Sequence, residues 1–321
     1  MRGFAAWRSA HCVTDDMSRQ APRTLTKLAA ALGLAAACAA GAAGAAHAGE
    51  SPFGWIYTAD VMPKGHFELE HSSFLQQGQT QGTYNYLKNR EEIEYGVTDR
   101  LQLSGYVNWS YTNAYRNGID GMTGGPGTDL GPNDDPAGRY RKTRFDGVSL
   151  EAIYQVLNPV TSPIGLAFYV EPEIGPRERA LEWRIILQKN FLDDRLIVAA
   201  NIMGEHEKEK TAMGDVERAS MIDLTAGASY RFTNNLSAGV EMRNHREFSG
   251  YWYNHREHSA WFLGPNLHYA TKRWWVTAAW RHQMPWVQTF NEDQEAVSAG
   301  GRIFGGEHAR NEFMVKVGVP F

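Results

Sequence analysis

The sequence predicts an all-β fold, namely a closed antiparallel transmembrane β-barrel of about twelve strands with short periplasmic turns and longer extracellular loops. Three observations predict it. Apolar and polar residues alternate with a period of two through most of residues 65–321. The connections between the alternating runs are mostly short and long in turn. The chain also ends in an alternating strand that finishes on an aromatic residue, Phe321.

Residues 1–48 are typical of an N-terminal extension followed by a cleaved signal peptide of the Sec type. Met17 is a second plausible start, and the apolar run from Leu28 ends at the cleavage-type sequence Ala46-His47-Ala48. A membrane anchor is an alternative, but the run is mostly Ala and Gly. Lipidation at Cys38 is another, although Ala35 stands where such signals prefer Leu. We expect residues 49–64 to form a periplasmic N-terminal segment and 65–321 the barrel.

Composition excludes several classes of protein. Residues 1–48 carry five basic and two acidic residues, so removing them changes the formal net charge from −4 to −7. This acidic balance argues against nucleic-acid binding. Both cysteines, Cys12 and Cys38, lie in the removed part, which leaves no thiol for disulfides or catalysis. The mean hydropathy of −0.45 resembles that of a soluble protein, but strands with one apolar face also give such a value.

Each strand is predicted by its own alternation. In Leu101–Tyr111, the residues Leu103, Val107 and Trp109 face one way and polar residues face the other, and the final strand alternates in the same way up to Phe321. The predicted strands lie near 65–76, 84–97, 101–112, 143–156, 164–174, 179–191, 195–206, 216–232, 236–248, 258–270, 273–286 and 309–321. Short turns at 98–100, 157–163, 192–194, 233–235 and 271–272 alternate with loops such as 113–142 and 287–308. The connection at 175–178 is the exception.

A soluble lipocalin-like barrel or a sandwich would also alternate, but its apolar face would point inward. Here the apolar face carries large aromatics near strand ends, and the opposite face carries many charges. Both features favour a barrel whose apolar face contacts lipid. The even number of strands fits closure, which leaves no exposed strand edge.

Several stretches carry a resemblance to known barrels. They are Phe53-Gly54-Trp55-Ile56-Tyr57-Thr58, Pro63-Lys64-Gly65, Glu94-Tyr95-Gly96-Val97-Thr98-Asp99-Arg100-Leu101, Gly264-Pro265 and the terminal Phe321. Together they resemble uncharacterised Gram-negative outer-membrane barrels and, more distantly, the outer-membrane proteins associated with meta-pathway phenol degradation. The resemblance implies a barrel in the cell outer membrane, and for the distant relatives a role in the passage of aromatic compounds. Phe321 resembles the terminal signal that the barrel-assembly machinery reads.

Charged residues on the inward face form a predicted belt about five to seven residues from the short turns, near mid-barrel at a rise of about 3.3 Å per residue. Its members, the candidate pore-lining residues, are Glu70, Glu92, Glu151, Glu171, Arg184, Glu241, Arg243, Arg281 and Lys316. We expect Glu171 to face Arg184, and Glu70 to lie between Glu92 and Lys316. The belt is either an ion-pair network that fills a modest lumen or a constriction that selects a polar solute. The first interpretation is favoured, since ion pairs satisfy inward charges in small barrels.

Other candidate sites are weaker. One is a His-rich stretch whose imidazole and carboxylate groups offer ligands for zinc or copper, although its spacing fits no closed metal site. It runs from Asn244-His245-Arg246-Glu247 to Asn254-His255-Arg256-Glu257-His258. Loop 113–142 carries Asp120, Asp129, Asp134 and Asp135 among glycines, without EF-hand spacing. Four tyrosines predicted to point inward, Tyr84, Tyr86, Tyr106 and Tyr169, are positioned either to stack an aromatic solute or to fill space. His245 and Ser249 are the best catalytic pair, yet no nucleophile elbow accompanies them.

The sequence therefore predicts a passive channel or uptake pore for small solutes, with no catalytic residues, no metal and no cofactor. The expected partners are outer-membrane lipid and lipopolysaccharide, the assembly machinery through Phe321, and a small-molecule solute, without nucleic acid. A closed-lumen barrel with a structural or surface-binding role is the alternative, and an outer-membrane hydrolase is a third hypothesis.

Overall fold

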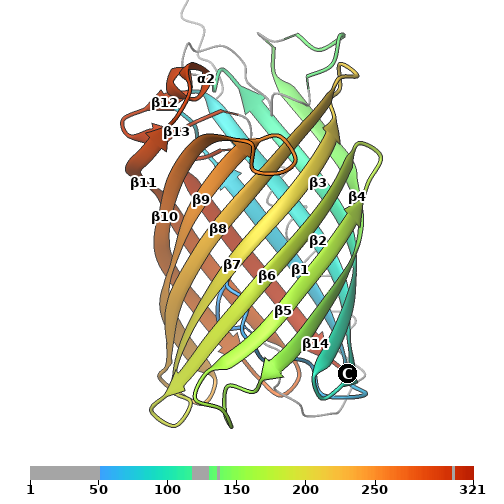
Figure 1. Cartoon of the computed structure of the whole chain (residues 1–321), viewed down its shortest axis with the longest axis vertical. Helices are drawn as coiled ribbons and strands as arrows, with labels where there is room; N and C mark the ends of the chain where they lie inside the picture. The colour runs from blue at the N-terminus through green and yellow to red at the C-terminus, as the bar shows by residue number, and fades with distance from the viewer. Residues whose placement is uncertain (1–50, 118–129, 136–137, 306–307) are drawn as a thin grey trace, which may run out of the picture. The chain divides into compact units, whose positions relative to one another are not determined.

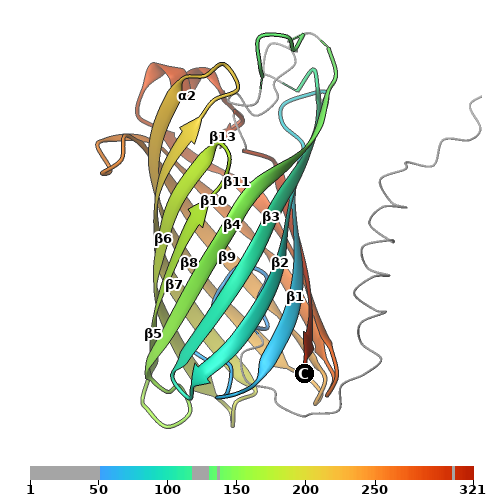
Figure 2. The same cartoon turned by 90° about the vertical axis from the view of Figure 1, so that its right-hand side faces the viewer.

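The computed structural model describes residues 51–117, 130–135, 138–305 and 308–321, all within one compact unit, Ala42–Phe321. Twelve strands of this unit form a closed barrel in the order β1-β14-β11-β10-β9-β8-β7-β6-β5-β4-β3-β2 (Figure 1, Figure 2). Neighbouring strands pair antiparallel, and the first strand pairs with the last. The predicted fold class is confirmed.

The barrel strands are β1 (Phe67–Gln77), β2 (Thr83–Thr98), β3 (Leu101–Tyr115), β4 (Tyr140–Leu157), β5 (Gly165–Ile174), β6 (Glu178–Phe191), β7 (Leu196–Lys210), β8 (Val216–Arg231), β9 (Leu236–Ser249), β10 (His255–Ala270), β11 (Trp275–Thr289) and β14 (Asn311–Pro320). Each predicted strand corresponds to one of them. The largest differences between predicted and observed residue ranges lie at the ends of the strands. Strand β7 runs four residues beyond the prediction because Glu207–Lys210 keep pairing with β6 and β8, although these charged residues carry no apolar alternation.

The predicted loop 287–308 contains structure of its own. It holds the short helix α2 (Glu292–Ala296) and a hairpin of β12 (Ser298–Ala299) and β13 (Arg302–Ile303), outside the barrel sheet. Asn291 caps α2, since its side chain accepts a hydrogen bond of 2.8 Å from the Gln294 backbone N–H. Among the described residues, no helix is long and apolar enough to span a membrane.

The two faces of the wall differ as a membrane barrel requires. Outward apolar side chains are exposed, for example Leu150 at 59% and Ile174 at 62%, whereas inward Ser104 and Asn108 are at most 2% exposed. This arrangement reverses that of a soluble barrel, whose apolar face points inward. The alternative of a lipocalin-like barrel or sandwich is therefore excluded.

The barrel has two distinct ends. The turn end carries the short connections near 99–100, 158–164, 192–195, 232–235 and 271–274 together with Phe321, and the loop end carries the other connections, including α2 (Figure 1). Exposed outward aromatics lie near both ends, at Tyr154, Phe232, Tyr269 and Trp274 near the turn end and at Phe145, Trp286 and Phe290 near the loop end. Such aromatics are typical of the two interfaces of a membrane.

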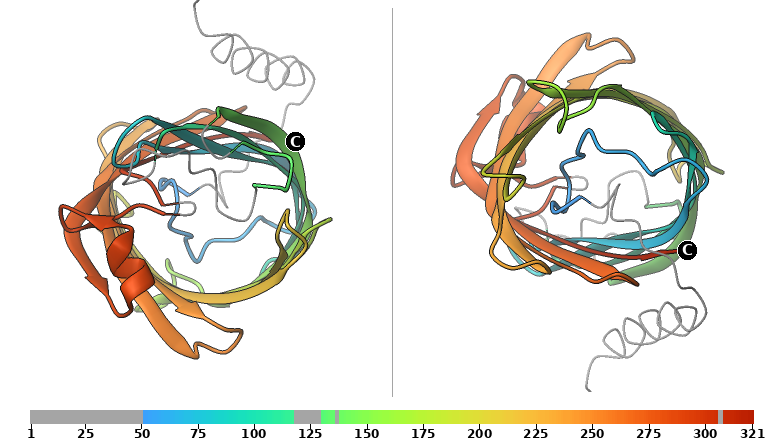
Figure 3. Two further views of the ribbon diagram at one scale, coloured as in Figure 1. Left: turned by 90° about the horizontal axis from the view of Figure 1, so that it is seen from above. Right: turned by 90° about the horizontal axis from the view of Figure 1, so that it is seen from below.

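The N-terminal segment corrects one prediction. Residues 49–64 were expected to lie in the periplasm, but the described part, the inner segment (residues 51–64), enters the barrel (Figure 3). Phe53, Ile56 and Ala59 are at most 1% exposed. The physical reason is that the inward face of β4–β7 is apolar at this level, where Ile153, Ala167, Ile186 and Ala199 pack against the segment.

The inner segment approaches the wall closely at two glycines. A Cβ on Gly54 would lie 2.7 Å from the Cβ of Ala279 on β11. A Cβ on Gly96 of β2 would lie 2.1 Å from the carbonyl oxygen of Pro63 in the segment. Both distances are shorter than real side chains tolerate, so glycine is needed where the two backbones meet.

Candidate functional site

The lumen contains the predicted belt. All nine belt residues carry side chains on the inward side of their strands: Glu70, Glu92, Glu151, Glu171, Glu241 and Arg281 are buried, and Arg184, Arg243 and Lys316 are mostly buried. The four predicted inward tyrosines, Tyr84, Tyr86, Tyr106 and Tyr169, are also buried. A role for these residues in conducting a solute remains a proposal.

The predicted pairing around β1 agrees with the geometry. Glu70 is the register partner of Glu92, and the Lys316 ammonium lies 2.9 Å from a Glu70 carboxylate oxygen. The other expected pair differs. Glu171 bonds with Arg90 of β2, while Arg184 bonds with Glu182, at 2.5 Å between Nε and Oε1. The register explains this, because Glu171 faces Glu182 and Arg184 faces Tyr169.

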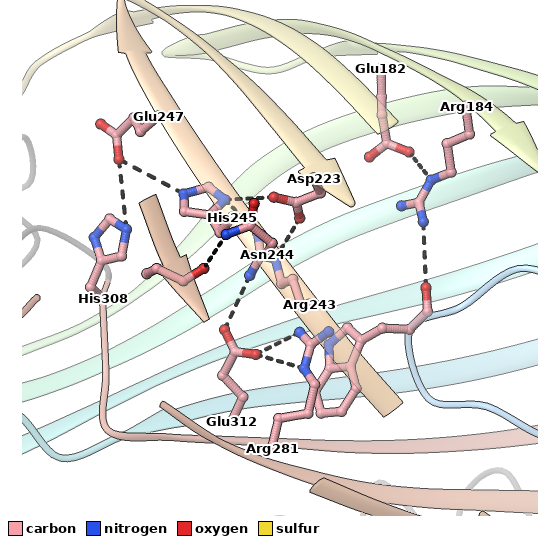
Figure 4. A network of polar contacts seen from close by, with 12 residues as sticks. Glu182, Arg184, Asp223, Arg243, Asn244, His245, Glu247, Arg281, His308 and Glu312 are labelled. Carbon is pink, nitrogen blue, oxygen red and sulfur yellow. Dashed lines mark hydrogen bonds and ion pairs between the residues drawn. The ribbon is translucent and has the colours of Figure 1, made fainter. Parts of the chain in front are cut away.

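A second group of ion pairs crosses β8, β9, β11 and β14 (Figure 4). Arg281 donates two hydrogen bonds to one Glu312 oxygen, at 2.9 and 2.5 Å, and Arg243 donates to the other at 3.2 Å. Arg243 also donates to Asp223 at 2.5 Å. The predicted belt lacks Arg90, Asp223, Glu182 and Glu312, although the period of two in their strands indicates that their side chains point inward. Their partners depend on register and on side-chain reach, which alternation does not specify.

Wall side chains hold the inner segment through its backbone. Glu241 accepts hydrogen bonds from the N–H groups of Gly54 at 2.6 Å and Trp55 at 3.0 Å. Asn201 bonds both the N–H and the C=O of Tyr57, at 2.8 and 2.9 Å. Further bonds come from Gln188, Gln155 and Gln102 to Ala59 and Met62. Buried backbone groups need such partners, so the lumen is built to receive this extended segment.

Side chains of the inner segment complete the contact. The Arg281 guanidinium lies 3.6 Å from the ring centre of Trp55, and that of Arg184 lies 4.4 Å from the ring centre of Tyr57. Burial, followed by the nearby Glu151 carboxylate, raises the pKa of the Tyr57 hydroxyl well above its ordinary value. Burial also raises the pKa of the Asp60 carboxyl, against a hydrogen bond from Gln188 that lowers it.

Above the inner segment, toward the loop end, lies a chamber of about 710 Å³. Gly54, Trp55 and Tyr57 contribute to its lining, so the chamber meets the inner segment. The lining includes twelve carboxylate side chains against seven of Lys or Arg, so the chamber is acidic. The excess lies on β6–β8, where Glu178, Glu182, Glu205, Glu207, Glu209 and Glu217 line one wall. Such a wall attracts cations.

The His-rich stretch is divided by the strands. His245 and Glu247 of β9 and His258 of β10 come together with His308, which precedes β14, and their ligand atoms lie within 4.8 Å of one another. His255 is not part of this group and is exposed. Two other groups of clustered ligand atoms consist of carboxylates alone. One group is Glu68, Glu70 and Glu94, and the other is Glu178, Glu205 and Glu207. The predicted His-rich site lacks His308, because the connection that carries it is about 50 residues further along the chain.

The other candidate residues of the sequence, the predicted catalytic pair and the acidic loop, make contacts of a different kind. Ser249 donates its hydroxyl to the His255 carbonyl at 3.5 Å, and the His245 ring contacts Asp223, Arg243 and Glu247. In loop 113–142, Asp120 and Asp129 lie outside the described residues. Asp134 pairs with Lys142 at 2.8 Å, and this contact lowers the pKa of its carboxyl.

Comparison with known proteins bears on fold and family. A family model described as a family of unknown function (DUF6662) matches residues 45–321. No curated protein matches the chain significantly. Among solved structures, the COG4313 outer membrane channel from Pseudomonas putida F1 aligns with a TM-score of 0.54 at 9% identity, over 81% of this chain and 97% of that one. The NanC porin aligns with a TM-score of 0.47 at 11% identity, over 78% and 98%. The KdgM porin aligns with a TM-score of 0.44 at 12% identity, over 79% and 99%.

Proposed function

Because the chain belongs to this family of unknown function, we propose its role from the barrel itself: an outer-membrane channel for small polar solutes, held closed by the inner segment. Export through residues 1–48, contact with lipid and lipopolysaccharide along the apolar face, and assembly through Phe321 are parts of the same proposal. The observation that carries it is the acidic chamber of about 710 Å³ that ends on the inner segment. A barrel with a purely structural role has no need for such a space.

The chemistry of the lining favours a class of solute. Its carboxylates attract positive charge, and Trp55, Tyr57 and Tyr106 present aromatic side chains at the end of the chamber near the inner segment. A small organic cation or zwitterion satisfies both features. The aromatic solutes implied by the distant resemblance also fit these faces.

Conductance tests the proposal. Glu241→Ala removes the acceptor of the Gly54 and Trp55 N–H groups, so the inner segment loses two buried hydrogen bonds. The cost is about 1–3 kcal/mol per unsatisfied group. We expect the purified variant to open in planar bilayers at least tenfold more often than the unsubstituted protein. Glu217→Ala is the matched control, because it removes one chamber carboxylate and leaves both hydrogen bonds in place.

The closed-lumen barrel is the second candidate, and the buried inner segment is the observation that favours it. Absence of openings above the lipid background in the unsubstituted protein and in both variants would refute the channel and support this candidate. Equal activity of Glu241→Ala and Glu217→Ala would keep a channel but reject the inner segment as its closure.

A further inference from the structure

We propose that His245, Glu247, His258 and His308 bind one divalent transition-metal ion, such as Zn²⁺, at the loop-end side of the chamber. The four residues come from three places in the chain: β9, β10 and the connection before β14. Three imidazoles and one carboxylate form a donor set that suits zinc and its neighbours in the first transition row. The site is separate from the inner segment and does not depend on whether the barrel conducts.

The spacing of the donor atoms suits an ion. One Glu247 oxygen, Oε2, lies 3.9 Å from His245 Nε2, 3.8 Å from His258 Nε2 and 3.6 Å from His308 Nε2. Ligands that hold Zn²⁺ tetrahedrally at about 2.0–2.1 Å lie roughly 3.3 Å from one another. The three Glu247 distances therefore exceed the tetrahedral spacing by about 0.3–0.6 Å, and the other donor pairs, all within 4.8 Å of one another, exceed it by at most about 1.5 Å.

Hydrogen bonds on the far side of two rings orient them for metal binding. His245 Nδ1 lies 2.7 Å from Asp223 Oδ1, and His308 Nδ1 lies 3.1 Å from the Gly305 carbonyl oxygen. Both partners accept, so we assign the hydrogen to each Nδ1, which leaves each Nε2 with its lone pair. The Arg243 guanidinium also lies 2.9 Å from His245 Nδ1 and would donate to this nitrogen if it were unprotonated. However, the lone pair of an unprotonated Nδ1 would be repelled by the Asp223 carboxylate, which lies 2.7 Å away. We therefore assign the hydrogen to the Asp223 contact.

His258 supplies the independent observation. Its side chain is fully buried, and neither ring nitrogen makes a hydrogen bond of acceptable geometry within the part of the chain that the structure describes, although the Gln294 side chain lies nearby. A buried imidazole without partners is costly, because both polar atoms have lost water. A metal ion bound to Nε2 removes this cost for one of them. The His258 ring centre lies 4.6 Å from that of His308, so it already faces the other ligands.

Charge and access support binding. Glu247 brings one negative charge to the site, and the nearby Arg243 guanidinium is engaged by Asp223 and Glu312. His245, Glu247 and His308 line the chamber, so an ion reaches them from its aqueous interior. Once bound, the ion would join β9, β10 and the connection before β14. Ca²⁺ and Mg²⁺ prefer oxygen donors, so imidazole ligands select against them.

Titration of the folded barrel tests the site. The protein is purified without a polyhistidine tag, treated with a chelator, and titrated with ZnCl₂ in a calorimeter. We expect one equivalent of Zn²⁺ per chain, visible absorption bands of four-coordinate Co²⁺ on titration with CoCl₂, and a higher melting temperature with Zn²⁺. CaCl₂ is expected to give no saturable binding. Absence of Zn²⁺ binding, or equal binding of Ca²⁺, overturns the proposal.

Variants assign the ligands. His258→Ala and His308→Ala are each expected to weaken Zn²⁺ binding more than tenfold, and Asp223→Asn, which alters the orientation of His245, by about 10–100-fold. His255→Ala is the matched control, because His255 belongs to the same stretch but is exposed. Glu247→Gln is a further ligand variant, which replaces the carboxylate with a side chain of the same size. The heat-dependent gel mobility of each variant verifies that its barrel is folded. Zn²⁺ binding that persists in all ligand variants would place the ion elsewhere and overturn the proposal.

Discussion

Asp60 is the residue of the inner segment whose ionisation opposes docking. Its pKa is raised in the docked state, chiefly by burial, so the docked segment binds the proton more tightly than a released one. Docking is therefore strongest below the ordinary aspartate pKa of about 4 and weakens as the pH rises through the raised value. Asp60→Asn keeps an acceptor for Gln188 but cannot ionise. We expect it to remove this pH dependence, which for one proton is at most tenfold per pH unit.

Hydrogen exchange of the Tyr57 and Ala59 amides measures docking directly, because both N–H groups bond wall side chains. The comparison is between the unsubstituted protein and Asp60→Asn at each pH, so titration of wall carboxylates cancels. Asp193→Asn, in the exposed turn after β6, serves as the control. Identical pH profiles for all three proteins would show that Asp60 does not govern docking.

At the same scale, sequence predicted the direction of side chains better than their partners. Period two places Glu171 and Arg184 inside the barrel, and they are inside. Their pairing fails because Arg90 reaches Glu171 from β2, past Asn108 and Ser149, to which it also donates hydrogen bonds. Such a contact between non-adjacent strands depends on the length of one side chain and on small residues between the two strands. The alternation of apolar and polar residues predicts neither of these features.

At the scale of elements, the acidic wall of β6–β8 predicts selectivity. Replacing Glu207 and Glu217 with Gln removes two charges from the chamber without changing side-chain size. At roughly 8 Å in a partly aqueous lumen, each charge contributes about 0.5–1 kcal/mol to the energy of a passing cation. We expect the cation-to-anion permeability ratio to fall about two- to fivefold for each charge. The reversal potential under a KCl gradient measures it, in the Glu241→Ala background so that channels open.

The control for this measurement is Glu292→Gln on α2, which removes an exposed charge at the loop end but none from the chamber lining. An unchanged reversal potential in the Glu207 and Glu217 variant would mean that solutes do not pass along this wall. A shift of equal size in Glu292→Gln would assign selectivity to the general charge of the loops.

The inner segment is the element that the sequence analysis placed wrongly, although a signal was present. Ile153 and Ile186 interrupt the polar face of β4 and β6, and both are at most 3% exposed. An apolar inward residue in a water-filled lumen would be unfavourable, so such positions indicate that something covers them. Strands were predicted well because alternation is local. The inner segment required contacts between residues about 100 positions apart.

At the scale of the whole molecule, closure depends on the pairing of β1 with β14. Their register runs from Glu68 opposite Pro320 to Gln77 opposite Asn311. Phe67 and Phe321 exchange backbone hydrogen bonds, at 3.3 and 2.9 Å, and their rings stack with centres 5.6 Å apart. The Phe321 side chain is nevertheless 48% exposed, so it is also accessible from outside.

Phe321 closes the barrel, and we also propose that it presents a terminal aromatic to the assembly machinery; its exposure allows these two roles to be tested separately. Phe67→Ala removes the same ring contact, together with the stacking of Phe67 on Tyr95, but keeps the terminal Phe. Phe321→Ala removes the ring contact and the terminal Phe, and Tyr95→Ala, which removes only the second stacking contact, is the control. If recognition dominates, Phe321→Ala lowers the amount of folded barrel in the outer membrane severalfold, while Phe67→Ala stays near the unsubstituted level. Heat-dependent gel mobility of membrane fractions measures this. Equal losses in both variants would assign Phe321 to closure alone, because the stacked rings are the contact that both variants lose.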